Sequence, residues 1–484
     1  METFVPLRDG EVRIYVCGMT PSARAHLGHA RSFLFFDVLR RYLTHRGYKV
    51  TFVQNVTDID DRSIDAGRQT GENYHAIIDR YYAEFKASMR NLGVLEYDAE
   101  PYATQYVPQI QRMIGALIER GHAYATSDGI YYRVSTFPNY GKLANRNIEE
   151  LEAGARIEVD EQKEDPLDFA LWKFAKPGEP KWAFDPYGEG RPGWHIECSA
   201  MSHELLDPKG EGFDIHGGGA DLIFPHHENE IAQSEPLMSR PPMANFWVHG
   251  GLLLFDSRKM SKSLGNFEPL STLLERYDPQ AVRLLFLQTG YRKVMNFTDE
   301  SIAAASAVLR QLKKSYRLLS AKRGSGDDDA QEVLVPPKPT DAREAAALLA
   351  RIEAALDDDM NTSVALAELL SDRTASFETF TRALTLLGIE PNESWLQEAK
   401  IELPSDFVAK VSAALSQFQG DPPLALDGAT PQEAVERIIE LRAQARARKD
   451  WAASDRLRDA LLRVNVELHD SKEGTTWSVS PVSS

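Results

Sequence analysis

The sequence contains little cysteine and no long apolar segment. Its 484 residues include only two cysteines, Cys17 and Cys198, which lie far apart in the chain. This excludes a disulfide framework and leaves either a metal site or two inert thiols. No apolar run is long enough to cross a bilayer, and residues 1–10 carry charges where a signal peptide needs an apolar stretch. We therefore expect a cytoplasmic protein that does not enter a membrane.

Positive charge is also scarce. The 55 lysines and arginines face 72 aspartates and glutamates, which gives a net charge of −17. Such a balance argues against a protein that coats nucleic acid through its overall charge, although it allows RNA binding by a local basic face. No repeat of solenoid length is visible. The length leaves room for several domains, each with its own core.

Residues 13–29 predict a strand, a tight turn and a helix. The strand is expected over 13–17, where β-branched and aromatic residues dominate, and a helical apolar pattern follows the turn. In an open parallel sheet such a turn lies at the edge where ligands bind, and a helix start binds anions. His26 and His29 flank Gly28, which permits close approach of a ligand. The pattern suits a nucleotide phosphate, although a short H-x-G-H also occurs by chance.

The following segments continue this pattern. A helix to Gly47 and a buried strand over 48–56 complete a β-α-β unit. The carboxylates of 57–61 could hold a metal, but a solvated turn or a helix cap is the simpler interpretation. Further helices are expected over 72–92 and 106–121.

We predict an α/β fold: a Rossmann-type parallel-sheet domain with an insertion, followed by a helical bundle and a small C-terminal α+β domain. A further strand is expected within 245–255, a surface loop at 324–340 and a linker at 420–431. The predicted boundaries give the first half of the sheet domain 1–123, the insertion 124–190, the second half 191–266, a connecting region 267–305, the helical bundle 306–419 and the C-terminal domain 420–484.

A possible metal site involves both cysteines. His226 and Glu230 lie four residues apart, so a helix would place them on one face. With Cys17 and Cys198 they supply four ligands of types that zinc accepts. His227 competes with His226 because it precedes Glu230 by three residues. A His–Glu pair at this spacing is more often a surface pair, and both interpretations stay open on spacing alone.

Two stretches carry clusters of positive charge. Lys259 and Lys262 stand in a K-x-x-K segment that, by itself, is typical of an exposed turn. The C-terminal region is the most basic part of the chain and predicts either a solvated helix face or an RNA-binding surface. Its basic residues are Arg442, Arg446, Arg448, Lys449, Arg456 and Arg458.

These motifs together resemble a known family. HLGH at 26–29 and KMSKS at 259–263 are similar to the paired signatures of class I aminoacyl-tRNA synthetases, and the first departs from the usual HIGH only at Leu27. Longer stretches resemble the cysteinyl-tRNA synthetases, among them RPGWHIECSAMS at 191–202 and the segment 216–235, HGGGADLIFPHHENEIAQSE. The likeness extends through the helical region to the C-terminal tail and covers nearly the whole chain.

The resemblance implies an activity and its cofactors. A family member activates L-cysteine with magnesium-bound ATP to cysteinyl adenylate and transfers the cysteine to the 3′ end of tRNA-Cys in translation, acting as a monomer. It implies one zinc ion held by Cys17, Cys198, His226 and Glu230, with the substrate thiolate as a further ligand. Zinc would then select cysteine over serine, and no editing domain is expected.

The resemblance also assigns site residues. The catalytic residues would be His26 and His29 with the loop lysines Lys259 and Lys262. ATP would be bound by Gly28, Gly218, Asp221 and Lys262, and cysteine by Gly18, Thr57, Trp194 and Asp221.

The tRNA would contact the second half of the chain. Residues 267–305 would meet its stem, the helical bundle would follow the inside of the L, and the C-terminal domain would read the anticodon, with bases stacked on aromatics such as Trp477.

One departure from the family leads to two rival interpretations. The chain has Cys-Gly-Met-Thr-Pro at 17–21 where the family usually has Cys-Gly-Pro-Thr. This difference affects the backbone of the turn that is expected to surround ATP. This turn is similar to that of the ligase that joins cysteine to glucosaminyl-inositol in mycothiol synthesis, an enzyme without a tRNA substrate. A synthetase-like RNA-binding protein without catalysis is the third possibility. The complete helical and C-terminal regions favour the synthetase.

Overall fold

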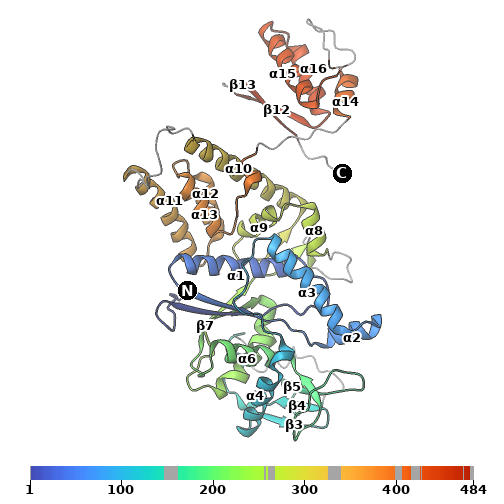
Figure 1. Ribbon diagram of the computed structural model, residues 1–484, viewed down its shortest axis with the longest axis vertical. Coiled ribbons are helices and arrows are strands. Elements are labelled where there is room, and N and C mark those ends of the chain that lie inside the picture. Colours follow the sequence, from blue (N-terminus) through green and yellow to red (C-terminus); the bar gives the residue numbers. More distant parts are fainter. Residues whose placement is uncertain are drawn as a thin grey trace. The chain divides into compact units, whose positions relative to one another are not determined.

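The computed structural model describes residues 2–145, 162–255, 258–259, 268–324, 339–397, 406–415, 426, 428–471 and 474–479 (Figure 1). The chain divides into two compact units, Met1–Leu396 and Gln397–Ser484, and each is described by itself.

A four-stranded parallel sheet forms the centre of the first unit. Its order is β2-β1-β7-β8. The strands are β1 (Glu11–Val16), β2 (Lys49–Gln54), β7 (Phe213–Gly219) and β8 (Ala244–Gly250). Helix α1 (Leu27–His45) connects β1 to β2, which confirms the predicted β-α-β unit and the Rossmann-type fold class.

The inserted segment forms a second, antiparallel sheet. It contains β3 (Ala123–Ala125), β4 (Gly129–Tyr132), β5 (Phe169–Phe174) and β6 (Gly190–Pro192). Helices α4 (Val107–Glu119), α6 (Trp194–Leu206) and α7 (Glu228–Ser234) share one buried cluster with it. The insertion therefore shares its core with helices that lie on both sides of it in the chain, α4 before it and α6 and α7 after it.

The region expected as one strand at 245–255 is divided in two. β8 ends at Gly250, and β9 (Leu253–Phe255) belongs to a different sheet, of order β10-β9-β11. The other strands are β10 (Arg258–Lys259) and β11 (Met295–Phe297). At Gly251 a Cβ atom would lie 2.5 Å from the Lys293 carbonyl oxygen, so the chain turns where only glycine fits.

Helices dominate the rest of the first unit. The expected helices at 72–92 and 106–121 correspond to α3 (Tyr74–Asn91) and α4, and α2 (Asp61–Thr70) precedes them. The second half contains α8 (Leu270–Arg276), α9 (Pro279–Leu287), α10 (Asp299–Gly324), α11 (Pro339–Asp357), α12 (Thr362–Ser371) and α13 (Phe377–Leu386). The loop expected at 324–340 falls mostly outside the described residues. None of the helices described combines the length and apolar composition needed to cross a membrane.

The second unit has a separate core. Helices α14 (Phe407–Ala414), α15 (Pro431–Ala447) and α16 (Trp451–Leu462) pack with the hairpin of β12 (Val466–Ser471) and β13 (Gly474–Val479). Its buried side chains include Val435, Ile438, Leu457 and Leu461. This is the small α+β unit that the sequence predicts, although the exact domain boundaries stay a prediction.

A buried ion-pair network connects α1 to the helical region. The Arg283 guanidinium, on α9, donates to the Asp37 carboxylate of α1 and to the Leu387 carbonyl oxygen, the latter at 2.9 Å. Arg41 Nε donates to the same carboxylate at 2.9 Å. Burial alone would raise the pKa of Asp37, but Arg283 and Arg41 together lower it. The network links the carboxylate of α1 to both α9 and the end of α13.

Breaking this network should destabilise the first unit. Arg283→Met leaves Asp37 with Arg41 as its one remaining cation, and we expect a loss of about 3 kcal/mol in the free energy of unfolding, measured by urea denaturation. Arg46→Met is the matched control, because Arg46 pairs with Asp357 at the surface and should change stability by less than about 1 kcal/mol. Equal losses in the two variants would contradict this account.

Candidate functional site

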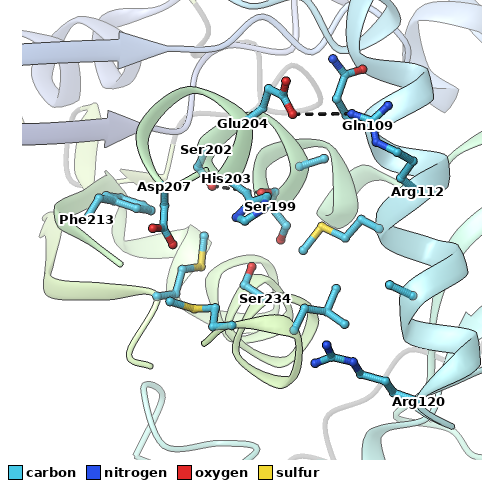
Figure 2. A pocket seen from close by; sticks show the side chains of 16 residues that line it. Gln109, Arg112, Arg120, Ser199, Ser202, His203, Glu204, Asp207, Phe213 and Ser234 are labelled. Atoms are coloured by element: carbon cyan, nitrogen blue, oxygen red, sulfur yellow. Dashed lines mark hydrogen bonds and ion pairs between the residues drawn. The ribbon is translucent and has the colours of Figure 1, made fainter. Parts of the chain in front are cut away.

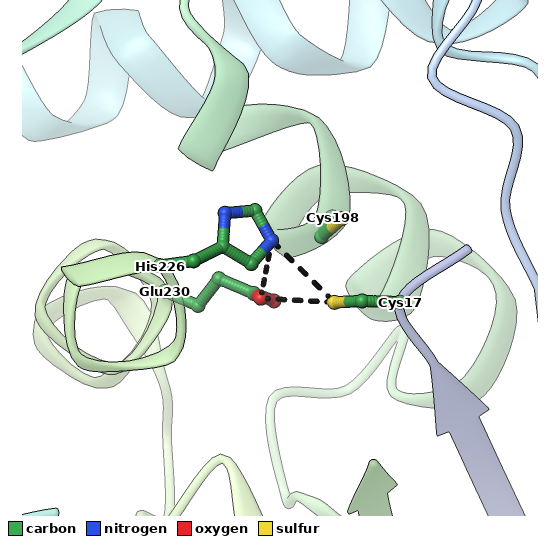
Figure 3. Close-up of side chains that lie close together, drawn as sticks. All are labelled: Cys17, Cys198, His226 and Glu230. Carbon is green, nitrogen blue, oxygen red and sulfur yellow. Dashed lines mark hydrogen bonds and ion pairs between the residues drawn. The ribbon is translucent and has the colours of Figure 1, made fainter. Parts of the chain in front are cut away.

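Four side chains from separate segments meet beyond the carboxyl end of β1 (Figure 3). Cys17 directly follows β1, Cys198 lies on the second turn of α6, His226 precedes α7 and Glu230 belongs to α7. These are the four residues expected to hold zinc, and we call them the four-residue cluster. The structure brings them together although 213 positions separate the first from the last.

The cluster is compact and closed to solvent. Cys17 Sγ lies 3.4 Å from both His226 Nε2 and Glu230 Oε1, and those two atoms are 3.1 Å apart. The ligand atoms of all four residues, Cys198 included, lie within 4.8 Å of one another. Every member is at most 6% exposed. Such polar groups are rarely buried together unless they bind one another or a common ion.

The pKa shifts within the cluster favour negative charge on Cys198 and Glu230 and positive charge on His226. A hydrogen bond with Cys17 lowers the pKa of Cys198 to about 6, whereas burial raises the pKa of Cys17. Burial would lower the pKa of His226, but Glu230 and Cys198 outweigh it and raise that pKa to about 10. Burial would raise the pKa of Glu230, yet His216 and His226 hold it well below its usual value.

The chemistry of these donors fits zinc. Two thiols, an imidazole nitrogen and a carboxylate oxygen match the ligand types of zinc, whereas calcium and magnesium prefer oxygen donors only. A second possible set shares two members with the first and consists of Cys17, His216, His227 and Glu230. It has one thiol instead of two and is the poorer match for zinc. His227, the competitor considered from the sequence, lies further from Glu230 than His226 does, with Nε2 4.0 Å from Oε1, and its Nδ1 lies 2.8 Å from His249 Nε2.

Sequence reasoning missed the groups that orient the cluster. His216, on β7, places Nε2 2.9 Å from Glu230 Oε2, and its ring stacks on Trp247 with centroids 4.5 Å apart. On the other side His195 Nδ1 lies 2.9 Å from His226 Nδ1. The only signal for His216 in the sequence is its position two residues before Gly218, near the end of a strand.

The two histidines of HLGH cap helix α1. His26 Nδ1 accepts the Gly28 N–H at 3.0 Å, and His29 Nδ1 accepts the His26 N–H at 3.2 Å. Burial lowers the pKa of both rings, that of His29 to about 3, so both are neutral near pH 7. Each ring then carries its proton on Nε2, which can donate to a ligand. The Gly28 amide, however, is already used by the cap.

Two glycines are explained by packing. A Cβ on Gly18 would lie 1.7 Å from the Asn55 carbonyl oxygen, and one on Gly218 would lie 3.0 Å from a ring carbon of His227. Asp221 follows closely in the short helix Ala220–Leu222. The expected substrate contacts of Gly18, Gly218 and Asp221 remain predictions, but the first two glycines have a structural reason of their own.

Trp194 and Thr57 lie next to the cluster. The indole of Trp194 stacks on the His226 ring, with centroids 4.3 Å apart and planes at 26°. Thr57 is buried just beyond β2, where its hydroxyl accepts from Asn55 Nδ2 at 3.3 Å. Trp194 thus contacts a member of the cluster directly, and Thr57 lies at the turn after Cys17, where its N–H donates to the Met19 carbonyl oxygen at 3.2 Å.

The structure describes only the first residue of the KMSKS motif. Lys259 ends the short strand β10, and Lys262 lies outside the described residues. Their expected role stays a prediction.

A separate cavity of about 280 Å³ lies against the side chains of α4 and α6 (Figure 2). Arg112, Ser199, His203 and Ser234 are among the side chains that line it. None of the described site residues predicted from the sequence lines this cavity, so it is distinct from the four-residue cluster.

Comparison with known proteins identifies the family of the chain. Residues 3–307 match the family described as tRNA synthetases class I (C) catalytic domain. A cysteine–tRNA ligase of Heliobacterium modesticaldum is 42% identical over 98% of this chain and 97% of its own length. Cysteine–tRNA ligases of Stutzerimonas stutzeri and of Pseudomonas aeruginosa are each 44% identical over 99% of the chain and 97% of their own length.

Solved structures share the fold at low sequence identity. A methionyl-tRNA synthetase of Mycobacterium tuberculosis matches with a TM-score of 0.53 and 15% identity, over 78% of this chain and 89% of that one. An arginyl-tRNA synthetase of Thermus thermophilus matches with a TM-score of 0.52 and 15% identity, over 81% and 84%. At this level of identity, these likenesses show that the chain shares its fold with the two structures. The chain belongs to the cysteine–tRNA ligases, a family of class I aminoacyl-tRNA synthetases.

Proposed function

We propose that this chain activates L-cysteine with ATP and magnesium, and esterifies tRNA-Cys with it, acting as a monomer in translation. The observation that carries the proposal is the buried four-residue cluster at the end of β1, the strand that precedes α1, in a chain that matches cysteine–tRNA ligases over 97% of their length. A thiol-selective pocket next to a nucleotide site is what the activation of cysteine requires.

The first half-reaction needs positioning and charge stabilisation. The carboxylate of cysteine attacks the α-phosphorus of ATP, the bond to the β-phosphate oxygen breaks, and pyrophosphate leaves. The neutral rings of His26 and His29 would donate from Nε2 to phosphate oxygens, while Lys259 and Lys262 would neutralise the charge that develops on pyrophosphate. The 2′-hydroxyl of the terminal adenosine of tRNA then attacks the carbonyl carbon and AMP leaves.

Cysteine selection is assigned to the four-residue cluster. Cys17, Cys198, His226 and Glu230 would hold zinc, which when bound supplies a Lewis acid that takes up a thiolate far more readily than a serine hydroxyl. An apolar pocket that measured size alone would separate such substrates by only about 1–3 kcal/mol. Trp194 and Thr57 would close the pocket around the amino acid.

His216 should strengthen metal binding through Glu230. His216→Phe retains an aromatic ring that can stack on Trp247 but removes the Nε2 group that contacts Glu230 Oε2. We expect the affinity for zinc to fall about 10–100-fold, as for other partners of metal ligands, measured by competition with a chromophoric chelator. An unchanged affinity in a normally folded variant would refute this role.

The second unit is proposed to read the anticodon. Trp477, the aromatic expected from the sequence, packs against the core of this unit, whereas Trp451 is 59% exposed and directly follows Lys449 and Asp450. Part of the basic surface is already neutralised, because Arg442 and Arg446 pair with Asp470. We therefore assign base stacking to Trp451 rather than to Trp477.

The test combines two assays on the zinc-loaded full chain. Cysteine-dependent exchange of labelled pyrophosphate into ATP measures activation, and acylation of tRNA with the GCA anticodon measures transfer, with glucosaminyl-inositol as the alternative acceptor. Exchange with tRNA charging is the expected result. Transfer to the sugar alone would identify a mycothiol-type ligase, and no exchange would leave an RNA-binding protein without catalysis.

A further inference from the structure

Glu197 is a fully buried carboxyl group that the mechanism above does not use. It lies on α6 between Trp194 and Cys198, the pocket wall and a member of the four-residue cluster, and its exposure is 0%. Neither of its carboxyl oxygens has a hydrogen-bond partner of good geometry in the described part of the chain. Burying such a group costs several kcal/mol unless a partner compensates it, which indicates that a ligand completes the site.

The surroundings of Glu197 are rich in acidic groups. Its strongest electrostatic neighbours are Cys198, Asp58 and Asp60, each of which carries negative charge when ionised. Burial and these three groups raise the pKa of Glu197, and the Thr57 hydroxyl acts in the opposite direction. Together these groups form a region of negative potential next to the cluster, suited to a positively charged ligand group.

A chain of polar contacts places this region at the edge of the sheet where ligands bind. The Gly18 N–H donates to Asn55 Oδ1 at 2.8 Å, and Asn55 Nδ2 donates to the Thr57 hydroxyl at 3.3 Å. Thr57 is in turn the neighbour of Glu197. The carboxyl group thus adjoins the turns that follow β1 and β2, beside the residue after Cys17.

We propose that Glu197 binds the α-ammonium group of the substrate cysteine. The inference rests on the proposed function, in which the sulfur of cysteine reaches the four-residue cluster. In cysteine, the sulfur and the nitrogen are attached to adjacent carbon atoms. A thiolate bound at the cluster would therefore hold the ammonium group of the same molecule close to the cluster. Glu197, the residue next to Cys198 in the chain, supplies the opposite charge there, and the pair satisfies both groups.

The test separates the amine from the thiol. Binding to the zinc-loaded full chain is measured by calorimetry for three compounds: cysteine, cysteamine, which lacks the carboxylate, and 3-mercaptopropionate, which lacks the amine. We expect Glu197→Gln to weaken cysteine and cysteamine about 10–100-fold, the effect of losing a charge-assisted hydrogen bond, and to leave 3-mercaptopropionate unchanged. Glu204→Gln, an exposed position on the same helix, should alter none of the three.

Two further measurements make the result decisive. Zinc content and thermal unfolding establish that Glu197→Gln is intact, and Glu197→Asp, which keeps the charge on a shorter side chain, should lose less affinity for the two amines. An equal loss for all three thiols, or no loss for any, would overturn the role of Glu197. If wild-type protein itself fails to bind cysteine and to exchange pyrophosphate, the proposed function has failed instead.

Discussion

Cys198→Ser is expected to abolish zinc binding and the activation of cysteine together. The variant removes one of two thiols from a buried donor set and leaves Cys17, His226 and Glu230 as a weaker three-residue group. Because changes to the partners of metal ligands already cost about 10–100-fold, loss of a ligand itself should cost about 1,000-fold or more in kcat/KM for cysteine-dependent pyrophosphate exchange. Zinc content by elemental analysis should fall in parallel.

Ser202→Ala is the matched control for this variant. Ser202 lies one turn further along α6, is fully buried, and donates to the Ser199 carbonyl oxygen at 3.2 Å. It should keep a full complement of zinc and lose little exchange activity. If Cys198→Ser instead retained one zinc per chain and exchanged pyrophosphate normally, the assignment of the four-residue cluster would be wrong.

Lys262→Ala should act on the chemical step without disturbing the amino-acid pocket. Removing a cation from the developing charge of pyrophosphate is expected to slow adenylate formation about 100–1,000-fold, measured in a single turnover at saturating ATP. Zinc content and cysteine affinity should be unchanged, because Lys262 is no part of the cluster. Lys209→Ala, at an exposed position beyond α6, serves as the control. A variant that loses cysteine affinity but forms adenylate at the normal rate would contradict this role.

Local patterns were enough to predict the β-α-β unit and the helices near 72–92 and 106–121. The first strand, α1 and β2 follow one another in the chain, and each has a period that the sequence displays. The division of 245–255 into two strands could not be predicted in this way. It depends on Gly251 packing against the backbone of residues 292 and 293, a contact that no local pattern contains.

The site, too, could be predicted only as far as local sequence patterns reach. The pairing of His226 with Glu230 follows from helical spacing, and the rarity of cysteine pointed to Cys17 and Cys198. The partners of these residues were missed, because His216 reaches Glu230 of α7 from strand β7 and the role of Glu197 depends on its burial near Thr57. Side-chain environments of this kind arise from tertiary packing and leave no periodic signal in the chain.

The buried network around Asp37 also determines how this protein can be divided. The same hydrophobic core runs from β1 and α1 through α9, α12 and α13. A fragment cut before α8 would lack Arg283 and would expose an apolar surface normally covered by these helices, so a minimal sheet domain should aggregate rather than fold. The boundary at Leu396 falls instead between two separate cores. A truncated enzyme for crystallography or engineering should therefore end near residue 396 and retain the whole helical region.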